Sequence, residues 1–548
     1  MTPHLFGLAE ARLNLVVLCR KVILELSSSP TPPPIDLSEA LKIAIAHHQD
    51  GRLPQAETIY RQILQQQPNH PDALTLMGVI ACQKGNLEEG IHLYRQALSI
   101  RHDHRQAWEN LNLALWKRGK ELIEEAIANY SLYANLQPGN VFANNALGNI
   151  YYDQNQLDQA LLYYHEALQG NPKDSDTLNR IGVILQQQKK LPLAQHFHEQ
   201  AIAHNPNDVD ALVSLAKAYL DYGDLTKALL YLNRALGLNP NHAIARYNRA
   251  LVLLQQGKFQ EGFVEYEWRL KTSEFPPCPF KQPMWDGSDL QGKTLLLHAE
   301  QGLGDTIQFI RYAAIAAQKN GRLIFTCHRP LIRLMQGLPE IVEFIPLGTP
   351  LPDFDTYTPL LSLPRILGTT IDNVPNQVPY LKPPSSEFQL PPSSVKNPRL
   401  KVGIVWSGGI LYKHNQTRSC SLNEFRPLLD VPEIAFYSLQ KGIPQIEIHQ
   451  LGFSDRLQDL NESLNDMADT ANAIAQLDLV ITVDTSVAHL AGALAKPVWV
   501  LLAHIADWRW MVNQENTPWY PTMRLFRQTT SGDWRGLMEQ VVKALEEL

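Results

Sequence analysis

The chain has 548 residues, which at roughly 150 residues per domain predicts three or four folded units. Hydrophobic residues make up 45% of the sequence and charged residues 19%, a balance that is typical of folded proteins and excludes disorder as the main state. The 48 Lys and Arg against 55 Asp and Glu give a net charge of -7, so we expect no broad basic field and no nucleic-acid partner.

The five cysteines are far apart and form neither a CxxC pair nor a cluster with histidine. This spacing predicts no disulfide framework and no metal site, and it favours a reducing, cytoplasmic compartment. The apolar run at residues 13–19 is followed by no convincing cleavage site, so we expect no signal peptide. No apolar run reaches the roughly 20 residues that a spanning helix needs, so we expect no membrane span.

Residues 1–36 form an N-terminal segment that contains the run Ser27 to Pro34, which predicts a stiff linker. From residue 37 to 275, prolines recur with a step of 34 residues, at Pro138, Pro172, Pro206 and Pro240. Periodic glycine, alanine and tyrosine positions accompany them, and the pattern resembles the tetratricopeptide repeat. We expect about seven units of two short helices each, stacked into an α-solenoid.

The concave wall of such a solenoid is where a partner is expected to bind. Amide side chains fall at the fifth or sixth place of several units and could bond the backbone of an extended peptide; they are Asn110, Asn145, Asn179 and Asn248. An ordinary polar surface is the alternative interpretation of these four residues. The groove remains a candidate acceptor site for a protein or peptide.

A second architecture follows the proline-rich stretch at residues 276–283, where the 34-residue period stops. Short β-rich runs then alternate with helical segments, which indicates parallel α/β sheets. We expect a first βα domain over 286–382, a linker over 383–398 and a second βα domain over 399–548. The predicted strands are 293–298, 323–327, 401–406, 435–439, 479–483 and 498–502, and the predicted helices are 306–319, 469–477 and one that begins at Ser486.

Two loops follow predicted strands and carry residues suited to ligand binding. In the first, Gly302 and Gly304 permit close backbone approach, and Asp305 stands at the start of a helix as a candidate general base. A plain strand-to-helix turn, with Asp305 favouring the helix dipole, is the alternative.

The second loop begins at Asp484, where a buried strand passes into a helix. The helix amides and the hydroxyls of Thr485 and Ser486 are suited to a diphosphate group. A standard capped helix, with His489 as a packing residue, is the alternative interpretation.

The motifs GLGD, from Gly302 to Asp305, and DTSVAHLAGAL, from Asp484 to Leu494, resemble the signature of the heptosyltransferase-like glycosyltransferases. The resemblance implies a GT-B fold in which the second βα domain binds a nucleotide sugar. It implies that Asp305 is the catalytic base. It also implies a basic donor-contacting residue in the loop after the first strand of the second domain, where Lys413 and Arg418 are the candidates.

In the same way, the resemblance places Asp484, Thr485, Ser486 and His489 in the donor-binding loop. The combination of tetratricopeptide repeats with a GT-B module is also similar to the protein O-GlcNAc transferases. Together these likenesses imply an inverting, metal-independent transfer from a nucleotide sugar, without another cofactor, to an acceptor selected by the repeats. A non-catalytic scaffold with a degenerate transferase-like module is the alternative function. The run Trp508 to Trp510 could stack on a base or sugar ring, although such clusters more often pack the rim of a domain.

Overall fold

The computed structural model describes residues 36–119, 123–275, 278–409 and 415–548. The predicted linker before residue 36 and the candidate Lys413 lie outside these described residues. The chain divides into two compact units, residues 1–177 and residues 178–548. No helix within the described parts combines the length and the apolar character that crossing a membrane requires.

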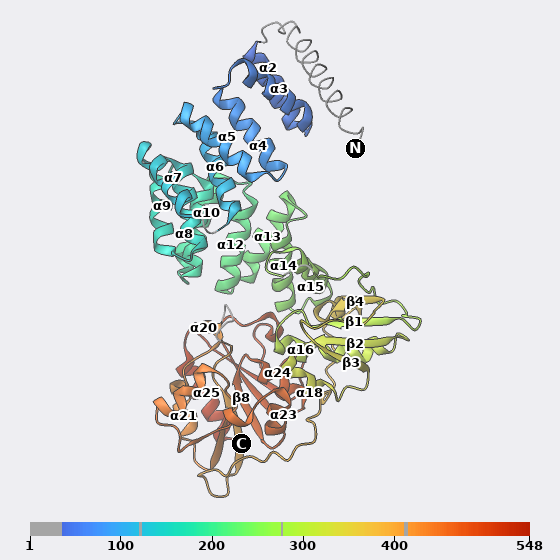
Figure 1. The fold of residues 1–548 in the computed structure, drawn as a ribbon. Coiled ribbons are helices and arrows are strands. Elements are labelled where there is room, and N and C mark those ends of the chain that lie inside the picture. Colours follow the sequence, from blue (N-terminus) through green and yellow to red (C-terminus); the bar gives the residue numbers. More distant parts are fainter. Residues whose placement is uncertain (1–35, 120–122, 276–277, 410–414) are drawn as a thin grey trace, which may run out of the picture. The chain divides into compact units, whose positions relative to one another are not determined.

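The first unit is a run of short helices joined as hairpins (Figure 1). The helices are α2 (Leu37–Gln49), α3 (Leu53–Gln66), α4 (Pro71–Gln83), α5 (Leu87–Ile100), α6 (Arg105–Arg118), α7 (Ile123–Leu136), α8 (Val141–Asp153) and α9 (Leu157–Gly170). The next helix, α10 (Ser175–Gln187), contains the division between the two units.

The periodic glycines and tyrosines of the sequence are packing partners within each hairpin. A Cβ atom built on Gly78 would lie 2.5 Å from the ring of Tyr94, and one built on Gly148 would lie 2.4 Å from the ring of Tyr164. Both tyrosines are buried. A larger residue than glycine would therefore push the paired helices apart, which explains why these positions recur with the repeat period.

The second unit continues the helical hairpins with α11 (Leu191–His204), α12 (Val209–Tyr222), α13 (Leu225–Leu238), α14 (Ala243–Gln255), α15 (Phe259–Tyr266) and the 3₁₀ turn η2 (Glu267–Lys271). His198 occupies the place of the periodic tyrosine and lies against Gly182 in the same way. The run α2 to α15 fits a tetratricopeptide solenoid, and a region of parallel sheets follows it.

The first sheet has four parallel strands in the order β3-β2-β1-β4. The strands are β1 (Thr294–His298), β2 (Arg322–Cys327), β3 (Ile341–Pro346) and β4 (Thr356–Pro359). The connecting helices are α16 (Leu303–Phe309), η3 (Ile310–Tyr312), α17 (Ala313–Ala317), α18 (Ile332–Met335) and α19 (Leu363–Ile366). The helix predicted over 306–319 is thus divided into α16, η3 and α17, and it begins at Leu303.

The second sheet has six parallel strands in the order β10-β9-β8-β5-β6-β7. The strands are β5 (Leu400–Val405), β6 (Ile434–Ser438), β7 (Leu457–Asp459), β8 (Leu479–Val483), β9 (Val498–Leu502) and β10 (Met523–Arg527). The helical elements around it include α20 (Asn415–Arg418), α21 (Arg426–Leu429), α22 (Glu447–Gln450), α23 (Met467–Ala475), α24 (Ser486–Ala493), η9 (Trp508–Trp510) and α25 (Trp534–Glu546).

One hydrophobic core joins the last repeat to both sheets. Phe259 and Phe263 of α15 belong to the same buried cluster as Phe309 of α16 and as Trp508 and Trp519 of the second βα region. Phe259 stacks on Trp519 with ring centroids 5.5 Å apart. Because these rings are buried together, the last repeat is part of the packing that holds the two sheets, although its sequence belongs to the helical period.

Candidate functional site

The two glycine-rich and hydroxyl-rich loops meet at the carboxyl ends of their strands. The first loop follows β1 and leads into α16, and the second follows β8 and leads into α24. A Cβ atom built on Gly304 would lie 2.9 Å from Cδ2 of His489 and 3.5 Å from Cα of Ser486. Residues about 180 positions apart in the chain are therefore in contact, and only glycine at position 304 permits this approach.

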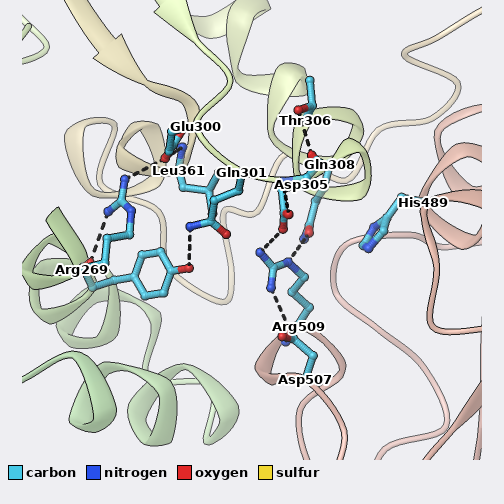
Figure 2. Close-up of polar contacts among 12 residues, drawn as sticks. Arg269, Glu300, Gln301, Asp305, Thr306, Gln308, Leu361, His489, Asp507 and Arg509 are labelled. Carbon is cyan, nitrogen blue, oxygen red and sulfur yellow. Dashed lines mark hydrogen bonds and ion pairs between the residues drawn. The ribbon is translucent and has the colours of Figure 1, made fainter. Parts of the chain in front are cut away.

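Both carboxylate oxygens of Asp305 already have partners (Figure 2). One oxygen accepts a hydrogen bond from the Gly302 backbone N–H at 3.0 Å, which satisfies that donor at the start of α16. The other accepts from Nη2 of Arg509 at 2.5 Å. The side chain remains 23% exposed. Asp305 is thus held in one orientation at the surface of the site rather than buried in the core.

Arg509 joins the two βα regions around Asp305. Its Nε donates to Oε1 of Gln308 at 2.9 Å, and its Nη1 donates to Oδ1 of Asp507 at 2.8 Å. The guanidinium lies 4.5 Å from the centre of the Trp508 ring. Burial alone would lower the pKa of Arg509, but the carboxylates of Asp507 and Asp305 raise it well above its usual value. Arg509 is therefore a permanent buried cation.

The Trp508 to Trp510 run is interior and does not form a ring-stacking surface. Trp508, Arg509 and Trp510 are 4%, 6% and 0% exposed. The two tryptophan rings pack in the core shared with the last repeat. Arg509 bonds Asp305, and the Trp510 ring stacks on His489.

The second loop leaves backbone donors available at the start of α24. The Thr485 hydroxyl accepts from the Val487 N–H at 3.3 Å and bonds the Thr482 hydroxyl at 3.0 Å, so Thr485 is the N-cap residue. Among the described residues, no acceptor faces the backbone N–H groups of Thr485 and Ser486. Free N–H groups at a helix start favour an anion, because the helix dipole adds a partial positive charge there.

His489 lies in the packed interior beneath these donors. It is 5% exposed, its Nδ1 is 3.0 Å from the Tyr520 hydroxyl, and its ring stacks on Trp510 with centroids 5.2 Å apart. Burial, with the nearby arginine charges, lowers its pKa well below the usual value, so the ring is neutral. His489 therefore supports α24 and does not face solvent as a ligand-binding side chain.

Asp484 and Arg418 lie together at the carboxyl end of the second sheet. Burial, followed by the charge of Asp507, raises the pKa of Asp484 to about 6, and the charge of Arg418 opposes that rise. Arg418 packs on the loop after β5, where a Cβ atom on Gly408 would lie 2.9 Å from Nη2 of Arg418. Arg418, one of the two basic candidates from the sequence, therefore lies beside this site; the other candidate, Lys413, is outside the described residues.

A buried ion pair supports the first loop from the side of the repeats. Arg269, in η2, is fully buried and donates to Oε1 of Glu300 at 2.9 Å. The same oxygen accepts from the Leu361 backbone N–H at 3.2 Å, and Gln301 donates to the Tyr266 hydroxyl at 3.3 Å (Figure 2). Sequence reasoning missed this support. The available signal was a charged residue, Glu300, directly after an apolar strand, since a buried carboxylate needs a partner.

The four asparagines of the predicted groove differ in their surroundings. Asn110 is half-buried. Asn145 is engaged within the first unit, because it donates to Asp174 and accepts from the Thr177 hydroxyl. Asn179 and Asn248 are 8% and 5% exposed. Asn110 and Asn145 are thus half-buried, whereas Asn179 and Asn248 are buried.

Family models identify the helical part of the chain. Tetratricopeptide repeat models match residues 47–112 and 141–174, and the model of anaphase-promoting complex, cyclosome, subunit 3 matches residues 185–268. The chain therefore contains tetratricopeptide repeats, a class of protein-interaction scaffold.

Relatives and solved structures cover parts of the chain. Protein FlbA of Caulobacter vibrioides is 26% identical over 335 residues, which is 55% of this chain and 55% of FlbA. Tetratricopeptide repeat-containing protein trd-1 of Caenorhabditis elegans is 27% identical over 127 residues, 23% of this chain and 16% of trd-1. The matches span about half or less of the length of these relatives. A tetratricopeptide repeat protein from Parabacteroides merdae is similar at 17% identity with a TM-score of 0.36, covering 43% of this chain and 93% of that structure.

Proposed function

We propose that the two-sheet region binds a nucleoside-diphosphate sugar and transfers the sugar to an acceptor held by the repeats. The observation that carries this proposal is the contact between the starts of α16 and α24. That contact brings a partly exposed carboxylate, Asp305, close to the unpaired N–H groups of Thr485 and Ser486. Ligands of parallel α/β sheets bind at the carboxyl ends of the strands, where both loops lie.

Different residues bind the leaving diphosphate and accept the proton of the acceptor. The diphosphate accepts hydrogen bonds from the Thr485 and Ser486 N–H groups, and the charge of Arg418 and the α24 dipole offset its negative charge. Asp305 takes the proton from the acceptor hydroxyl as the new bond from that oxygen to the sugar carbon forms. The bond from the sugar carbon to the diphosphate breaks, and the diphosphate leaves with the electron pair. Attack opposite to the leaving group inverts the configuration at that carbon.

The ion pair with Arg509 is compatible with this role for Asp305. A carboxylate has about four lone-pair positions, and the bonds from Gly302 and Arg509 occupy two of them. The remaining positions are free to accept a proton.

A non-catalytic scaffold is the second candidate function. The observation that favours it is that both oxygens of Asp305 are already bonded, as in a purely structural helix cap. In this case the repeats recruit protein partners, and the two sheets only extend the folded surface.

Titration of the full chain with a panel of nucleotide sugars separates the two functions. A ligand at 100 times its dissociation constant stabilises the protein by about 2.7 kcal/mol, which raises the melting temperature. We then expect Asp305→Asn to reduce release of the nucleoside diphosphate by about 100-fold or more, with ligand affinity nearly unchanged. The matched control is Asp455→Asn, at an exposed loop position, which keeps both properties. A panel without any thermal shift favours the scaffold, and equal loss of affinity and turnover in Asp305→Asn removes Asp305 from the base role.

A further inference from the structure

The segment between β9 and β10 that contains Arg509 rests on the repeats. We call residues 503–512 the β9 loop. A Cβ atom on Gly223, in the turn between α12 and α13, would lie 2.6 Å from Cδ1 of Ile505. One on Gly257, in the turn between α14 and α15, would lie 2.8 Å from Cε of Met511. Two turns of the solenoid therefore contact the β9 loop closely, and glycine at both turns leaves room for it.

A hydrogen bond adds to this contact. Nε2 of Gln255, at the end of α14, donates to the backbone carbonyl of Ala506 at 3.3 Å. Ala506 directly precedes Asp507, whose side chain caps η9 and accepts from Arg509. The position of the Arg509 guanidinium is thus set from one side by the repeats and from the other by α16.

The guanidinium group of Arg509 is suited to fix the orientation of Asp305. Each of its three guanidinium nitrogens has its own acceptor, namely Gln308, Asp507 and Asp305. The planar group also contacts the rings of Trp508 and Phe309, whose centres lie 4.5 Å and 5.7 Å from the guanidinium carbon. A lysine would supply the charge without the fork that fixes three partners in one plane. Asp305 therefore has one orientation only as long as Arg509 keeps its own.

We infer that Arg509 is the positioning residue for Asp305, and that the last two repeats set its position through the β9 loop. This inference rests on the proposed function, since it assigns a role to the residue that orients the proposed base. The repeats that hold the acceptor then also fix the orientation of the carboxylate that takes its proton. The other titratable groups whose charges act on or near Asp305 are His328, after β2, and Tyr266, in α15.

The test uses the full chain and measures nucleoside-diphosphate release from the nucleotide sugar that gives the largest thermal shift. Arg509→Gln is expected to lower kcat by about 100-fold, since misplacement of a reacting group by about 1 Å has that cost, with donor KM changed less than about threefold. Arg509→Lys keeps the charge but not the fork, so we expect kcat to fall in this variant as well, again with little change in donor KM.

A second ion pair between the same two βα regions supplies the matched control. Arg333 of α18 bonds Asp466 and Asp469 at the start of α23 and is distant in sequence from both site loops. Arg333→Gln breaks this link between the regions, and we expect it to leave kcat and donor KM within about twofold of wild type, as for a half-exposed pair. Melting curves of all variants show whether each remains folded.

Ile505→Ala tests the contribution of the repeats without touching Asp305. We expect kcat to fall by about 3-fold to 10-fold with KM unchanged, because Arg509 is held less firmly when the β9 loop is looser. If wild type turns over the sugar and Arg509→Gln keeps kcat, the inference is wrong while the proposed function stands. If Ile505→Ala behaves as wild type, the link to the repeats is wrong. If wild type neither binds nor hydrolyses any nucleotide sugar, both the proposed function and the inference are wrong.

Discussion

The loops before α16 and α24 occupy equivalent places in the two sheets but are supported in different ways. The loop before α16 is bonded to the last repeat, through Glu300 with Arg269 and through Gln301 with Tyr266. The loop before α24 is supported within its own sheet, by the bond between the hydroxyls of Thr482 and Thr485. The first loop is therefore sensitive to the repeats, whereas the second depends on the core around β8.

The two loops also differ in what they leave open. At the start of α16 the Asp305 carboxylate bonds the Gly302 N–H, so the helix end is closed by its own acidic residue. At the start of α24 the Thr485 hydroxyl caps Val487, and the N–H groups of Thr485 and Ser486 have no acceptor among the described residues. The first loop therefore presents a positioned carboxylate, whereas the second presents backbone N–H donors for an anion.

The largest expected effect follows from breaking the buried ion pair that links the first loop to the repeats. Arg269→Ala leaves the Glu300 carboxylate buried without its cation, and burial already raises the pKa of Glu300 despite Arg269. We expect a loss of about 3–5 kcal/mol in unfolding free energy. Urea denaturation measures it.

The matched control for Arg269→Ala is Arg322→Ala. Arg322 forms an exposed pair with Glu343 beside the same sheet, with 57% and 43% of the side chains exposed. We expect a change of about 0–1 kcal/mol there. Equal effects of the two substitutions would show that the buried pair does not anchor the first loop.

The next effect concerns the contact between the two loops. In Gly304→Ala the new Cβ would lie 2.9 Å from the His489 ring, which cannot move easily because it stacks on Trp510. We expect destabilisation of about 1–3 kcal/mol from overpacking. Gly237→Ala in α13 is the control, because a Cβ there has no atom within 4 Å; it is expected to stabilise by about 0.5–1 kcal/mol. Calorimetry distinguishes the opposite signs, and stabilisation by Gly304→Ala would contradict the contact.

The smallest expected effect is the pH dependence of folding stability that the Asp484 carboxylate of the second loop causes. The folded-state pKa of Asp484, about 6, lies above the unfolded value near 3.9, so the folded protein binds the proton more tightly. Stability is therefore lost as pH rises from about 4 to 6, and the loss is complete above pH 6. We expect Asp484→Asn to be more stable than wild type by about 1–2 kcal/mol at pH 8, with no difference at pH 4.

The control for this prediction has the opposite sign. Burial raises the pKa of Asp469, but the hydrogen bonds from Arg333 and Asn465 and the charge of Arg333 together outweigh burial and lower that pKa. Asp469→Asn should therefore be less stable than wild type at both pH 8 and pH 4, because the difference disappears only as pH falls from 3.8 through the lower folded pKa. Urea midpoints of both variants at pH 4 and pH 8 test the pair. A destabilised Asp484→Asn at pH 8 would contradict the burial of this carboxylate.

Much of the helical part and part of the sheets could be predicted from the sequence. The strand predictions 479–483 and 498–502 are confirmed as β8 and β9, because both are continuous apolar runs buried on both faces. The strands β3, β4, β7 and β10 were not predicted. β7 has only three residues and β4 four, so neither carries enough periodicity to be distinguished from a loop.

By itself, the sequence determined the repeat period and the helix start at Ser486, because helix pairs and caps depend on residues a few positions apart. The first helix of the sheet region begins at Leu303, three residues before its predicted start. Only the tertiary structure decided which side chains meet there. Arg509 and Asp305 are 204 residues apart, and Arg269 and Glu300 are 31 residues apart. Such pairs have no local pattern, because buried charges meet only when packing of the shared core brings their elements together.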